Sequence, residues 1–470
     1  MKKFLSLCLA VTIILGLCAC SGSSAEPTQN TYTGFQVGYN RQSIMPEGDI
    51  GLSGYGNPEV RRSTGYRDIL YATCLAFSEG GQTILHFSAD VISFPVTAPI
   101  REAISEKTGV PTGNIMISGT HTHSGPEYTE EPYFSNTFIP ACVTAAEKAI
   151  ADLAPATMYG TKAITEGMSY VRHYITRDGI YVDNSTASSV GSAWLEKHAR
   201  EADPEMTIVK FERENDKKDI TLINWHCHPA FALEKHTYLS ADFVASLRSK
   251  VEAETGTNVI YFTGGAGDVG VSSKLVGGII RDNSVTFGEE LADFALAALK
   301  GTMTKIEGSG LKINHERFEY PNNRYGIEKL EDAKKVKAFA EQKGSMEDAE
   351  AMAYAKELGF ASPREASTII VNAAKPEMGT MELNALYISG LAFVTAPYEM
   401  CAQDGVVIKE GSPFEFTIIC SCSNEHYSYF ARKEAFESPK AVYEVTTAKF
   451  AKGAAEATAA ELVSMLGALK

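Results

Sequence analysis

Short apolar runs, each followed by a polar or glycine-rich loop, recur along this chain and predict β-strands. Longer amphipathic segments between them predict α-helices. The predicted strands lie at residues 34–46, 70–77, 83–87, 115–117, 203–212, 219–225, 258–262 and 414–419, with a strand pair at 383–395 that turns at Ser389-Gly390. The predicted helices lie at 99–107, 140–153, 243–255, 284–300, 327–358 and 443–469. This mixture indicates an α/β fold, and we expect mixed β-sheets in the centre flanked by helices, as an αββα-like layered domain.

One helical stretch, residues 327–358, is charged and alanine-rich and is interrupted at Gly344-Ser345. The pattern predicts a pair of helices inserted into a domain that spans residues 34–470. We expect this helical insertion to pack on the surface of the domain. A lid over a substrate is the alternative interpretation.

The N-terminus has the pattern of a targeting segment. Met1-Lys2-Lys3 is followed by an apolar run that is too short for an ordinary membrane span, and this run ends in Leu17-Cys18-Ala19-Cys20, which resembles a bacterial lipobox. We therefore expect a signal peptide at residues 1–19, a lipid on Cys20, and a flexible tether at 20–33. An ordinary signal peptide cut nearby is the alternative. Both interpretations place the mature protein outside the cytoplasm, and the first anchors it to a membrane of the bacterial cell envelope.

Composition and charge exclude some classes of partner. The hydrophobic content of 44% and the charged content of 21% are ordinary for a globular protein of 470 residues. The formal net charge of −15 argues against a nucleic-acid partner, which requires a basic surface. Six scattered cysteines beyond the tether match no small disulfide scaffold, and the sequence sets neither their pairing nor the oligomeric state.

Two histidines stand in the loop after the predicted strand at 115–117, within Thr120-His121-Thr122-His123-Ser124-Gly125-Pro126. Histidines at i and i+2 on an extended backbone point the same way. Imidazole is the commonest protein ligand of zinc, so the pair is a candidate metal or acid–base centre. A loop with two solvated or capped histidines is the alternative.

A second loop repeats this arrangement after another predicted strand, in Asn224-Trp225-His226-Cys227-His228-Pro229. His226 and His228 are competing ligands there, because both are within reach by alternation. The next predicted strand leads into Gly264–Gly270, which formally contains the G-x-G-x-x-G pattern of dinucleotide sites. No helix pattern opens at its last glycine, so a glycine-rich wall against a metal site is the favoured interpretation. The glycines of residues 48–55 also predict a close approach to a site.

Strand ends are where α/β folds assemble their sites. The polar residues that follow predicted strands are His121, His123, Arg172, His228, Asp268, Glu399 and Tyr429. Two histidines and a carboxylate form the ligand set of a catalytic zinc with an open position. Such a metal lowers the pKa of bound water to about 7 and polarises a carbonyl group, which suits amide or ester hydrolysis.

The chain resembles the neutral (non-lysosomal) ceramidase family. The residues that carry the resemblance occur in family order: Ser118-Gly119-Thr120-His121-Thr122-His123-Ser124-Gly125-Pro126, Asn224-Trp225, His228-Pro229, Gly267-Asp268, Pro397-Tyr398-Glu399, Tyr427, Tyr429 and Tyr443-Glu444. They span most of the mature chain. The histidine motif is specific, and the order of the others adds weight to it.

The resemblance implies a zinc ion held by His121, His228, Glu399 and Tyr429. It implies that His123 binds the substrate carbonyl or shuttles protons and that Arg172 binds substrate. With Asp268, these two are the predicted catalytic residues. Reasoning from residue types alone agrees on His121, His228 and Glu399, leaves His226 open, and does not single out Tyr429.

The chain departs from the family pattern at several positions. Ceramide-cleaving members carry a serine where this chain has Gly270, followed here by Val271 instead of proline, and Tyr398 replaces the usual glycine of the Pro-Gly-Glu motif. Longer members continue into a C-terminal sandwich domain, which we do not expect here because the sequence ends soon after Tyr443-Glu444. Without the serine, zinc-activated water is the expected nucleophile.

The sequence therefore predicts a zinc-dependent hydrolase that cleaves the amide bond of an N-acyl sphingosine or a related N-acyl lipid. An esterase or amidase acting on a small non-lipid substrate is the second hypothesis, motivated by the missing serine and domain. A solute-binding lipoprotein that has lost catalysis is the third. A Ser-His-Asp hydrolase based on Ser124 is disfavoured, because no Gly-x-Ser-x-Gly elbow surrounds that serine.

Overall fold

The computed structural model describes residues 32–184, 187, 192–231, 235–271, 280–440 and 442–470. The predicted signal peptide, Cys20 and most of the predicted tether lie outside the described residues. Within those residues, no helix is both long and apolar enough to span a bilayer. The six cysteines of residues 34–470 are all buried and unpaired.

A nine-stranded mixed sheet forms the larger of two central layers. Its strands, in spatial order, are β14 (Asn258–Thr263), β12 (Ile220–Trp225), β11 (Glu205–Arg213), β6 (Ala154–Ile164), β1 (Gln36–Ser43), β3 (Tyr71–Glu79), β4 (Gln82–Ala89) and β5 (Ile115–Gly119), and β16 (Thr304–Ile306) also pairs with β6. The turn between β3 and β4 is Gly80-Gly81, with φ angles of 60° and 82°. These angles favour glycine, so this hairpin forms where the sequence predicts it.

A four-stranded sheet packs against the inner face of the large sheet. Its strands are β17 (Leu311–Pro321), β18 (Met378–Ile388), β19 (Leu391–Thr395) and β20 (Thr417–Cys420). The two sheets share one apolar core, in which the ring of Phe393 lies 5.9 Å from that of Phe77 and 6.3 Å from that of Phe262. Burial of this core holds the two layers face to face.

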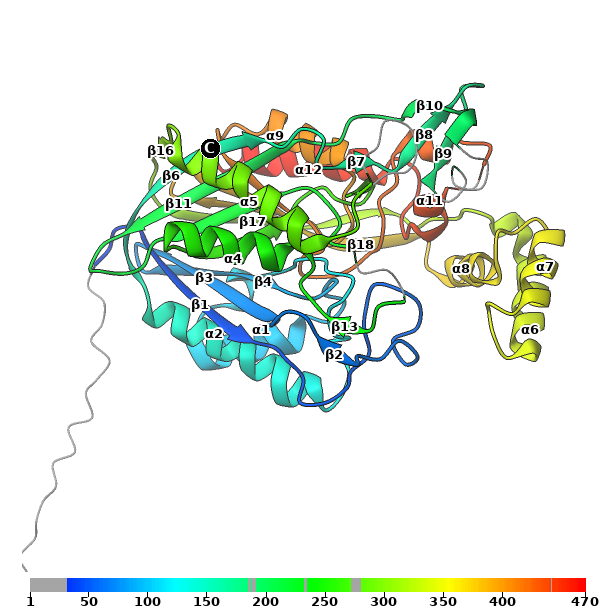
Figure 1. Cartoon of the computed structure of the whole chain (residues 1–470), viewed down its shortest axis with the longest axis horizontal. Coiled ribbons are helices and arrows are strands. Elements are labelled where there is room, and N and C mark those ends of the chain that lie inside the picture. The colour runs from blue at the N-terminus through cyan, green and yellow to red at the C-terminus, as the bar shows by residue number, and fades with distance from the viewer. Residues whose placement is uncertain (1–31, 185–186, 188–191, 232–234, 272–279, 441) are drawn as a thin grey trace, which may run out of the picture. The chain divides into compact units, whose positions relative to one another are not determined.

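Helices cover the outer faces of both sheets (Figure 1). The large sheet is covered by α1 (Ala98–Thr108), α2 (Ile139–Ala151), α4 (Phe243–Thr255) and α5 (Ser284–Lys300), and the small sheet by α9 (Ala402–Gly411) and α12 (Ala454–Gly467). The predicted αββα-like α/β fold is therefore confirmed. Smaller elements near the site are β2 (Gly65–Tyr66), β7 (Tyr170–Val171), β8 (His173–Thr176), β9 (Tyr181–Asp183), β10 (Leu195–His198), β13 (Tyr238–Leu239), β15 (Val269–Gly270), α10 (Lys433–Phe436) and α11 (Tyr443–Thr447).

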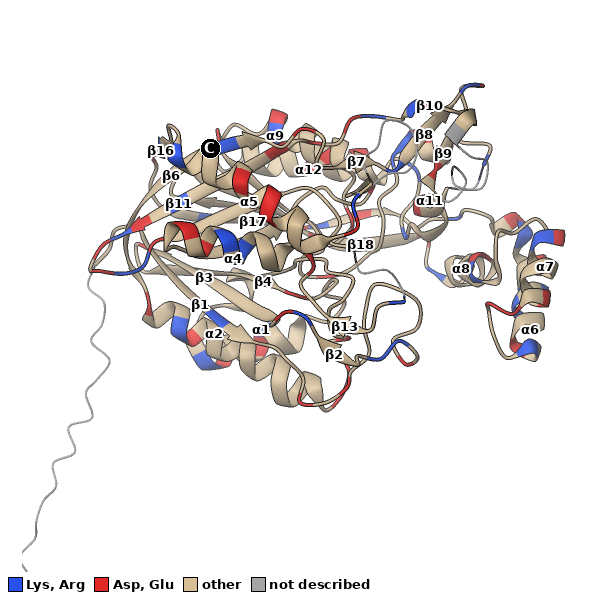
Figure 2. Cartoon of the chain, in the orientation of Figure 1, with Lys and Arg blue, Asp and Glu red and all other residues tan. Residues whose placement is uncertain are grey.

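The helical segment after β17 contains α6 (Leu330–Lys343), α7 (Ala349–Glu357) and α8 (Pro363–Ala374). The first two are the predicted pair, and α6 ends at Gly344, where φ is 76°. The three helices enclose a small core of their own, formed by Ala333, Val336, Ala355, Phe360, Ala366 and Ile369. Figure 2 shows Lys or Arg and Asp or Glu positions interspersed along α6 and α7, as expected for helices with one solvated face.

Three parallel strand pairs, β4 with β5, β12 with β14 and β19 with β20, send their carboxyl ends toward one region. A buried amide ties two of these pairs together, since Asn224 donates to the Ile419 carbonyl at 2.8 Å and accepts from the Ile419 amide at 2.9 Å. The loops that leave these strands carry most of the predicted site residues.

A buried ion pair at the end of β4 generates a stability prediction. The Nη1 and Nη2 atoms of Arg248 donate to the Asp90 carboxylate, at 3.0 and 2.8 Å, and neither side chain is more than 4% exposed. Asp90→Asn leaves the buried cation without its partner, so we expect the free energy of unfolding to fall by about 3 kcal/mol in urea titrations. Asp293→Asn, at the exposed Lys250–Asp293 pair, is the control and should change it by less than about 1 kcal/mol. Equal effects at both sites would contradict the prediction.

A buried histidine in β4 generates a prediction on pH. His86 is fully buried between Phe262 and Phe393, and burial lowers its pKa to about 3. Between the unfolded value of about 6.5 and this folded value, the unfolded chain binds a proton that the folded chain does not, so stability falls as the pH falls, by up to about 1.4 kcal/mol per pH unit. His86→Gln should reduce this slope in urea unfolding between pH 7 and pH 4.5. Parallel curves for the two proteins would show that His86 is not the cause.

Candidate metal centre

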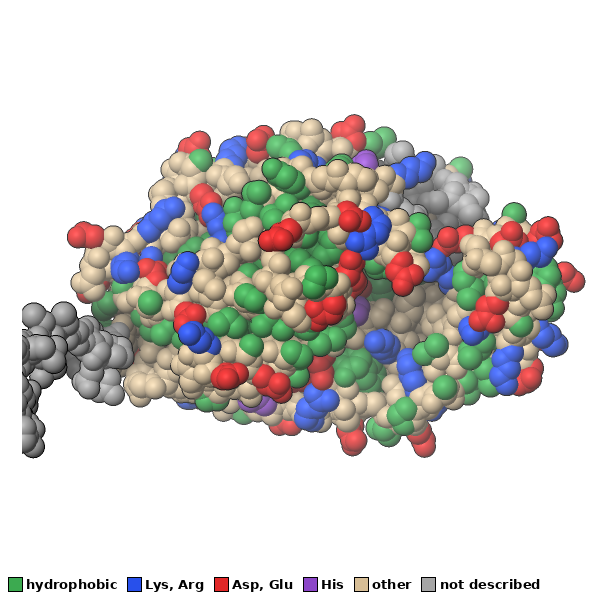
Figure 3. Space-filling view, turned by 90° about the horizontal axis from the view of Figure 1, so that it is seen from below, with side chains coloured by type: hydrophobic (Ala, Val, Ile, Leu, Met, Phe, Trp, Pro, Cys, Tyr) green, Lys and Arg blue, Asp and Glu red, His purple; other side chains and the backbone are tan. Residues whose placement is uncertain are grey.

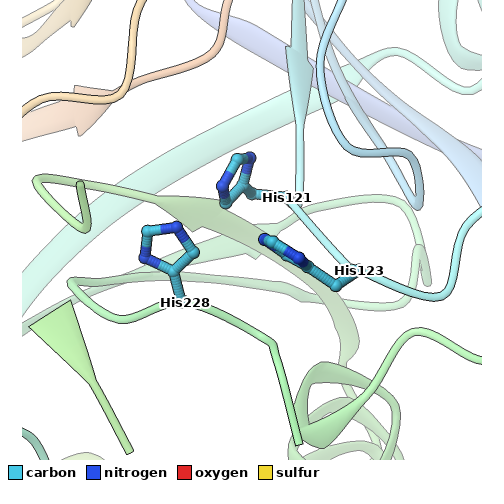
Figure 4. Close-up of side chains that lie close together, drawn as sticks. All are labelled: His121, His123 and His228. Carbon is cyan, nitrogen blue, oxygen red and sulfur yellow. The ribbon is translucent and has the colours of Figure 1, made fainter. Parts of the chain in front are cut away.

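Three buried histidines meet at the carboxyl ends of the parallel strands (Figure 4). His121 and His123 follow β5, and His228 follows β12. Each offers a ring nitrogen, and these nitrogens lie within 4.8 Å of one another. The ring centroids of His121 and His228 are 4.7 Å apart. Two loops that are about a hundred residues apart in sequence therefore form one cluster, as the repeated strand–histidine pattern predicts.

The backbone fixes the imidazole of His121. This residue has a φ of 68°, a left-handed conformation that few non-glycine residues adopt. Its backbone amide donates to the carbonyl of Val91 at 3.0 Å, and its Nδ1 lies 2.7 Å from the carbonyl of Ile92. Because a carbonyl oxygen only accepts, the proton of the ring belongs on Nδ1, and Nε2 presents its lone pair to the cluster.

His228 is held in the same manner. Its Nδ1 lies 2.6 Å from the carbonyl of Ala266, which leaves Nε2 directed at the carboxylate of Glu399. The same Oε2 atom of Glu399 lies 3.1 Å from Nε2 of His228 and 3.3 Å from Nε2 of His121. Two imidazole lone pairs and a carboxylate oxygen thus converge on one point.

Glu399 and Tyr429 come from the loops after β19 and β20 and form a parallel β-bridge with each other. Burial would raise the pKa of the Glu399 carboxyl, but the neighbouring His121 and His228 bring this pKa well below its usual range. The carboxylate is therefore ionised. The ring of Tyr429 stacks at 6.4 Å on that of His228, so the structure brings all four predicted metal ligands together.

His123 differs from the other two histidines. Neither of its ring nitrogens has a hydrogen-bond partner within the described part of the chain, and burial lowers its pKa well below the ordinary value. Its ring lies 4.6 Å from the ring of Tyr55. Gly54 packs so closely that a Cβ there would lie 2.7 Å from the Cα of His123. The predicted approach of the glycines at residues 48–55 to the site is therefore correct.

Arg172 faces the cluster from the position between β7 and β8, and two partners fix its guanidinium. Nε donates to Glu444 at 3.0 Å, and Nη2 donates to the carbonyl of Gly267 at 2.8 Å. The guanidinium carbon lies 5.4 Å from the ring centroid of Tyr429. Glu444 is only 1% exposed and is also bound by His173 at 2.8 Å. A buried carboxylate thus aims Arg172 at the same point as the histidines.

Asp268, the third predicted catalytic residue, lies behind the cluster. One carboxylate oxygen accepts from the amide of Ala402 at 2.8 Å, and the other lies 3.1 Å from Arg200. Its carbonyl accepts from the amide of Arg172 at 2.8 Å. Its side chain is fully buried and does not line the cleft, so its contacts position the loops and Arg172 instead of touching a substrate.

The competing ligand His226 points away from the cluster. Its Nδ1 accepts from the amide of Gly265 at 3.0 Å, and its Nε2 lies 3.4 Å from Asp203. The glycine run forms the predicted wall, since a Cβ on Gly267 would lie 2.5 Å from the carbonyl oxygen of Glu399. The run continues into the strand β15 and not into a helix, so a dinucleotide site does not form.

The histidines open into a cleft of about 630 Å³. Besides the predicted residues, the residues that line it include Ser53, Tyr55, Pro58, Ile92, Pro95, Glu127, Tyr128, Arg364, His426, Ser428 and Tyr443. The space-filling view shows a hollow between the main body and the helical segment, with Lys and Arg side chains on its rim (Figure 3). Arg364 of α8 is a cleft residue that sequence reasoning did not find.

Sequence reasoning also missed Cys422, whose sulfur lies 3.4 Å from Nδ1 of His121, and the role of Glu444. The sequence did contain a signal for Glu444, because this residue belongs to the Tyr443-Glu444 motif that carries the family resemblance. At Gly270, the position of the family serine, an added Cβ would meet nothing within 4 Å. Packing therefore does not account for the glycine.

These residues fit a divalent metal ion. Carbonyls on both Nδ1 atoms fix the tautomer of His121 and His228, as is usual for histidine ligands of metals. The Nε2 atom of His121 is buried and has no hydrogen-bond partner within the described residues. An ionised carboxylate completes a two-histidine, one-carboxylate set of the kind that holds catalytic metals.

Two solved structures have a similar fold. One is the crystal structure of neutral ceramidase from Pseudomonas aeruginosa, with a TM-score of 0.69 and 16% sequence identity, over 93% of this chain and 75% of that chain. The other is described as ceramidase complexed with C2, with a TM-score of 0.68, 16% identity and the same coverage of 93% and 75%. At this level of identity, the likeness establishes the fold.

The sequence also matches a known family directly. Residues 35–278, which include the loops that carry His121, His123 and His228, match the family described as neutral/alkaline non-lysosomal ceramidase, N-terminal. This range covers more than half of the chain. The chain belongs to the neutral/alkaline non-lysosomal ceramidase family.

Proposed function

We propose that this protein hydrolyses the amide bond of an N-acyl lipid of the ceramide type, with a zinc ion in the histidine cluster. The observation that carries the proposal is the convergence of two tautomer-fixed imidazoles and the ionised Glu399 at the floor of a cleft. Membership of the ceramidase family supports the amide bond as the target. A solved structure of similar fold, described as ceramidase complexed with C2, supports a lipid amide.

In this proposal, His121, His228, Glu399 and Tyr429 hold the zinc ion. Their donor atoms are two neutral imidazole nitrogens, a carboxylate oxygen and a phenol oxygen, a set that suits zinc. When bound, zinc would lower the pKa of a water molecule to about 7 and polarise a carbonyl group.

The other cleft residues have roles in moving protons and charge. Arg172 is aimed by Glu444 and would stabilise the negative charge that develops on the carbonyl oxygen. His123 has two ring nitrogens without partners in the described structure, so it can accept a proton from the attacking water and deliver it to the amine nitrogen. Addition of water forms the new C–O bond, the C–N bond then breaks, and the amide and water become a carboxylic acid and an amine.

We also propose that the protein works outside the cytoplasm of a bacterium, anchored to a membrane by a lipid on Cys20. The support for this is the lipobox-like run Leu17-Cys18-Ala19-Cys20. An N-terminal lipid would hold the enzyme at the surface where N-acyl lipids reside. Mass spectrometry of the mature protein should find the lipid on Cys20. An unmodified N-terminus elsewhere would refute this part of the proposal.

Replacement of a proposed ligand tests the metal centre. His121→Ala removes an imidazole that the backbone holds in place, so we expect the purified protein to lose most of its zinc, measured by inductively coupled plasma mass spectrometry. Hydrolysis of N-acyl sphingosine should fall at least a thousandfold. His226→Gln is the matched control, since this histidine faces Asp203 and should leave the zinc content unchanged. Full zinc and full activity in His121→Ala would exclude the assignment.

Replacement of His123 separates proton transfer from metal binding. His123→Ala keeps the four proposed ligands and should retain one equivalent of zinc. We expect the kcat for amide hydrolysis to fall by about 100- to 10,000-fold, the usual contribution of a general acid–base group. A loss of zinc along with activity would instead make His123 a ligand, as its place in the cluster with His121 and His228 allows.

A further inference from the structure

The helical segment contributes a charged side chain to the wall of the cleft. Arg364 is the second residue of α8, and its guanidinium lines the cleft together with Tyr443. Tyr443 in turn lies 5.4 Å from Tyr429, ring to ring, and Tyr429 stacks on His228. Ring contacts therefore lead from the metal centre to Tyr443, and the charge of Arg364 acts on Tyr443.

Arg364 differs from the other charged residues that line the cleft, which within the described part of the chain are Glu127, Arg172 and Glu399. Glu127 accepts from Ser53 and Thr129 at 2.8 and 2.7 Å. Arg172 is held by a buried carboxylate, and Glu399 by the two imidazoles. Each of these three charged groups therefore already has a partner within the protein.

The ion pair of Arg364, in contrast, is exposed to solvent. Its partner is Glu347, in the connection between α6 and α7, and the side chains are 55% and 65% exposed. Exposed pairs of this sort contribute little free energy, because water competes for both charges. A ligand anion in the cleft would therefore meet a guanidinium whose existing partner is easily replaced. In a chain with a net charge of −15, such a local cation is what an anionic substrate needs in order to approach.

Different residues line the cleft on the two sides of the metal centre. The flank beside His121 and His123 carries Ile92 and Tyr55, and Ile92 supplies the carbonyl that holds His121. The flank beside Tyr429 carries Tyr443 and Arg364. With the acyl chain along the side chains of Ile92 and Tyr55, the amine half of the substrate lies toward the arginine.

We infer that Arg364 forms a subsite for an oxyanion on the amine half of the substrate, so that the enzyme favours N-acyl amides with an acidic head group. This inference rests on the proposed amide hydrolysis and names its substrate class. These head groups share a carboxylate or sulfonate, which accepts paired hydrogen bonds from the guanidinium. The helical segment then acts as a specificity element in the cleft wall.

The test compares amides with the same acyl chain and different head groups: N-lauroylglycine, N-lauroyltaurine and the neutral N-lauroylethanolamine. Release of the amine by the zinc-loaded enzyme gives kcat and KM for each. In Arg364→Gln, we expect KM for the two anionic amides to rise about tenfold, the effect of losing one charge-assisted hydrogen-bonded contact. Neither kcat nor the KM for N-lauroylethanolamine should change. An effect on only one of the two anions tells a carboxylate subsite from a sulfonate subsite.

Two further variants control for structural effects. Glu347→Gln removes the competing carboxylate, so it should lower the KM for N-lauroylglycine about threefold, a change opposite to that in Arg364→Gln. Lys356→Gln removes one positive charge from α7 outside the cleft and should change nothing. Equal changes in KM for anionic and neutral amides, or no change in Arg364→Gln, would overturn the inference.

The inference and the proposed function fail in different ways. If the wild type cleaves N-acyl sphingosine but not N-lauroylglycine, the function holds and the anion subsite is wrong. If it cleaves no amide, the proposed function fails, and isothermal titration calorimetry with N-lauroylglycine and N-lauroylethanolamine then decides the subsite. Tighter binding of the anion that is lost in Arg364→Gln would support the subsite, and equal binding would refute it.

Discussion

The structure depends on a buried carboxylate held between two imidazoles. One oxygen of Glu399 lies 3.1 Å from His228 and 3.3 Å from His121, and all three side chains are almost completely buried. A charge in such a place is tolerated only where partners surround it. Backbone carbonyls on the far nitrogens of both rings prevent the imidazoles from rotating away. The fold must therefore bring three separate loops to one point and hold them there.

The αββα arrangement meets this requirement through its parallel strand pairs. The loops with His121, His228 and Glu399 follow β5, β12 and β19, and each of these strands lies beside a parallel neighbour. Parallel strands end on the same side of a sheet, so their loops are neighbours without being close in sequence. The amide of Asn224 fixes the register between the two sheets, because it pairs with the backbone of Ile419 in β20. Rigid strands thus determine the geometry of irregular loops.

Much of this arrangement could be predicted from the sequence, because the strands before the loops are uninterrupted apolar runs. The run at residues 115–117 and the one at 258–262 are strands within a residue or two of their predicted ends. The helix α8 could not be predicted, because its β-branched run Thr368-Ile369-Ile370-Val371 is typical of strands. The strand β17 was missed because charged residues interrupt its alternation. In both cases packing against neighbouring elements overrides a weak local pattern.

Some residues of the candidate site could likewise be predicted from the sequence, and others could not. Histidines that follow strands are visible in a sequence, because their spacing and neighbours repeat in two loops. The side to which His226 turns is not visible, since it depends on Asp203, a residue of the chain before β11. Arg364 was hidden for another reason, because it lies beyond the predicted helical insertion of residues 327–358, in a stretch for which the sequence predicted no element.

The helical segment therefore need not be a lid to affect catalysis. A lid closes over a substrate and excludes water, and its charge is secondary. A fixed wall acts through the side chains that it places in the cleft, and α8 places a guanidinium there beside Tyr443. The segment has a small apolar core of its own, which holds α8 against α6 and keeps the base of Arg364 in place. Arg364 would thus act on the choice of head group, while the metal centre acts on the amide bond.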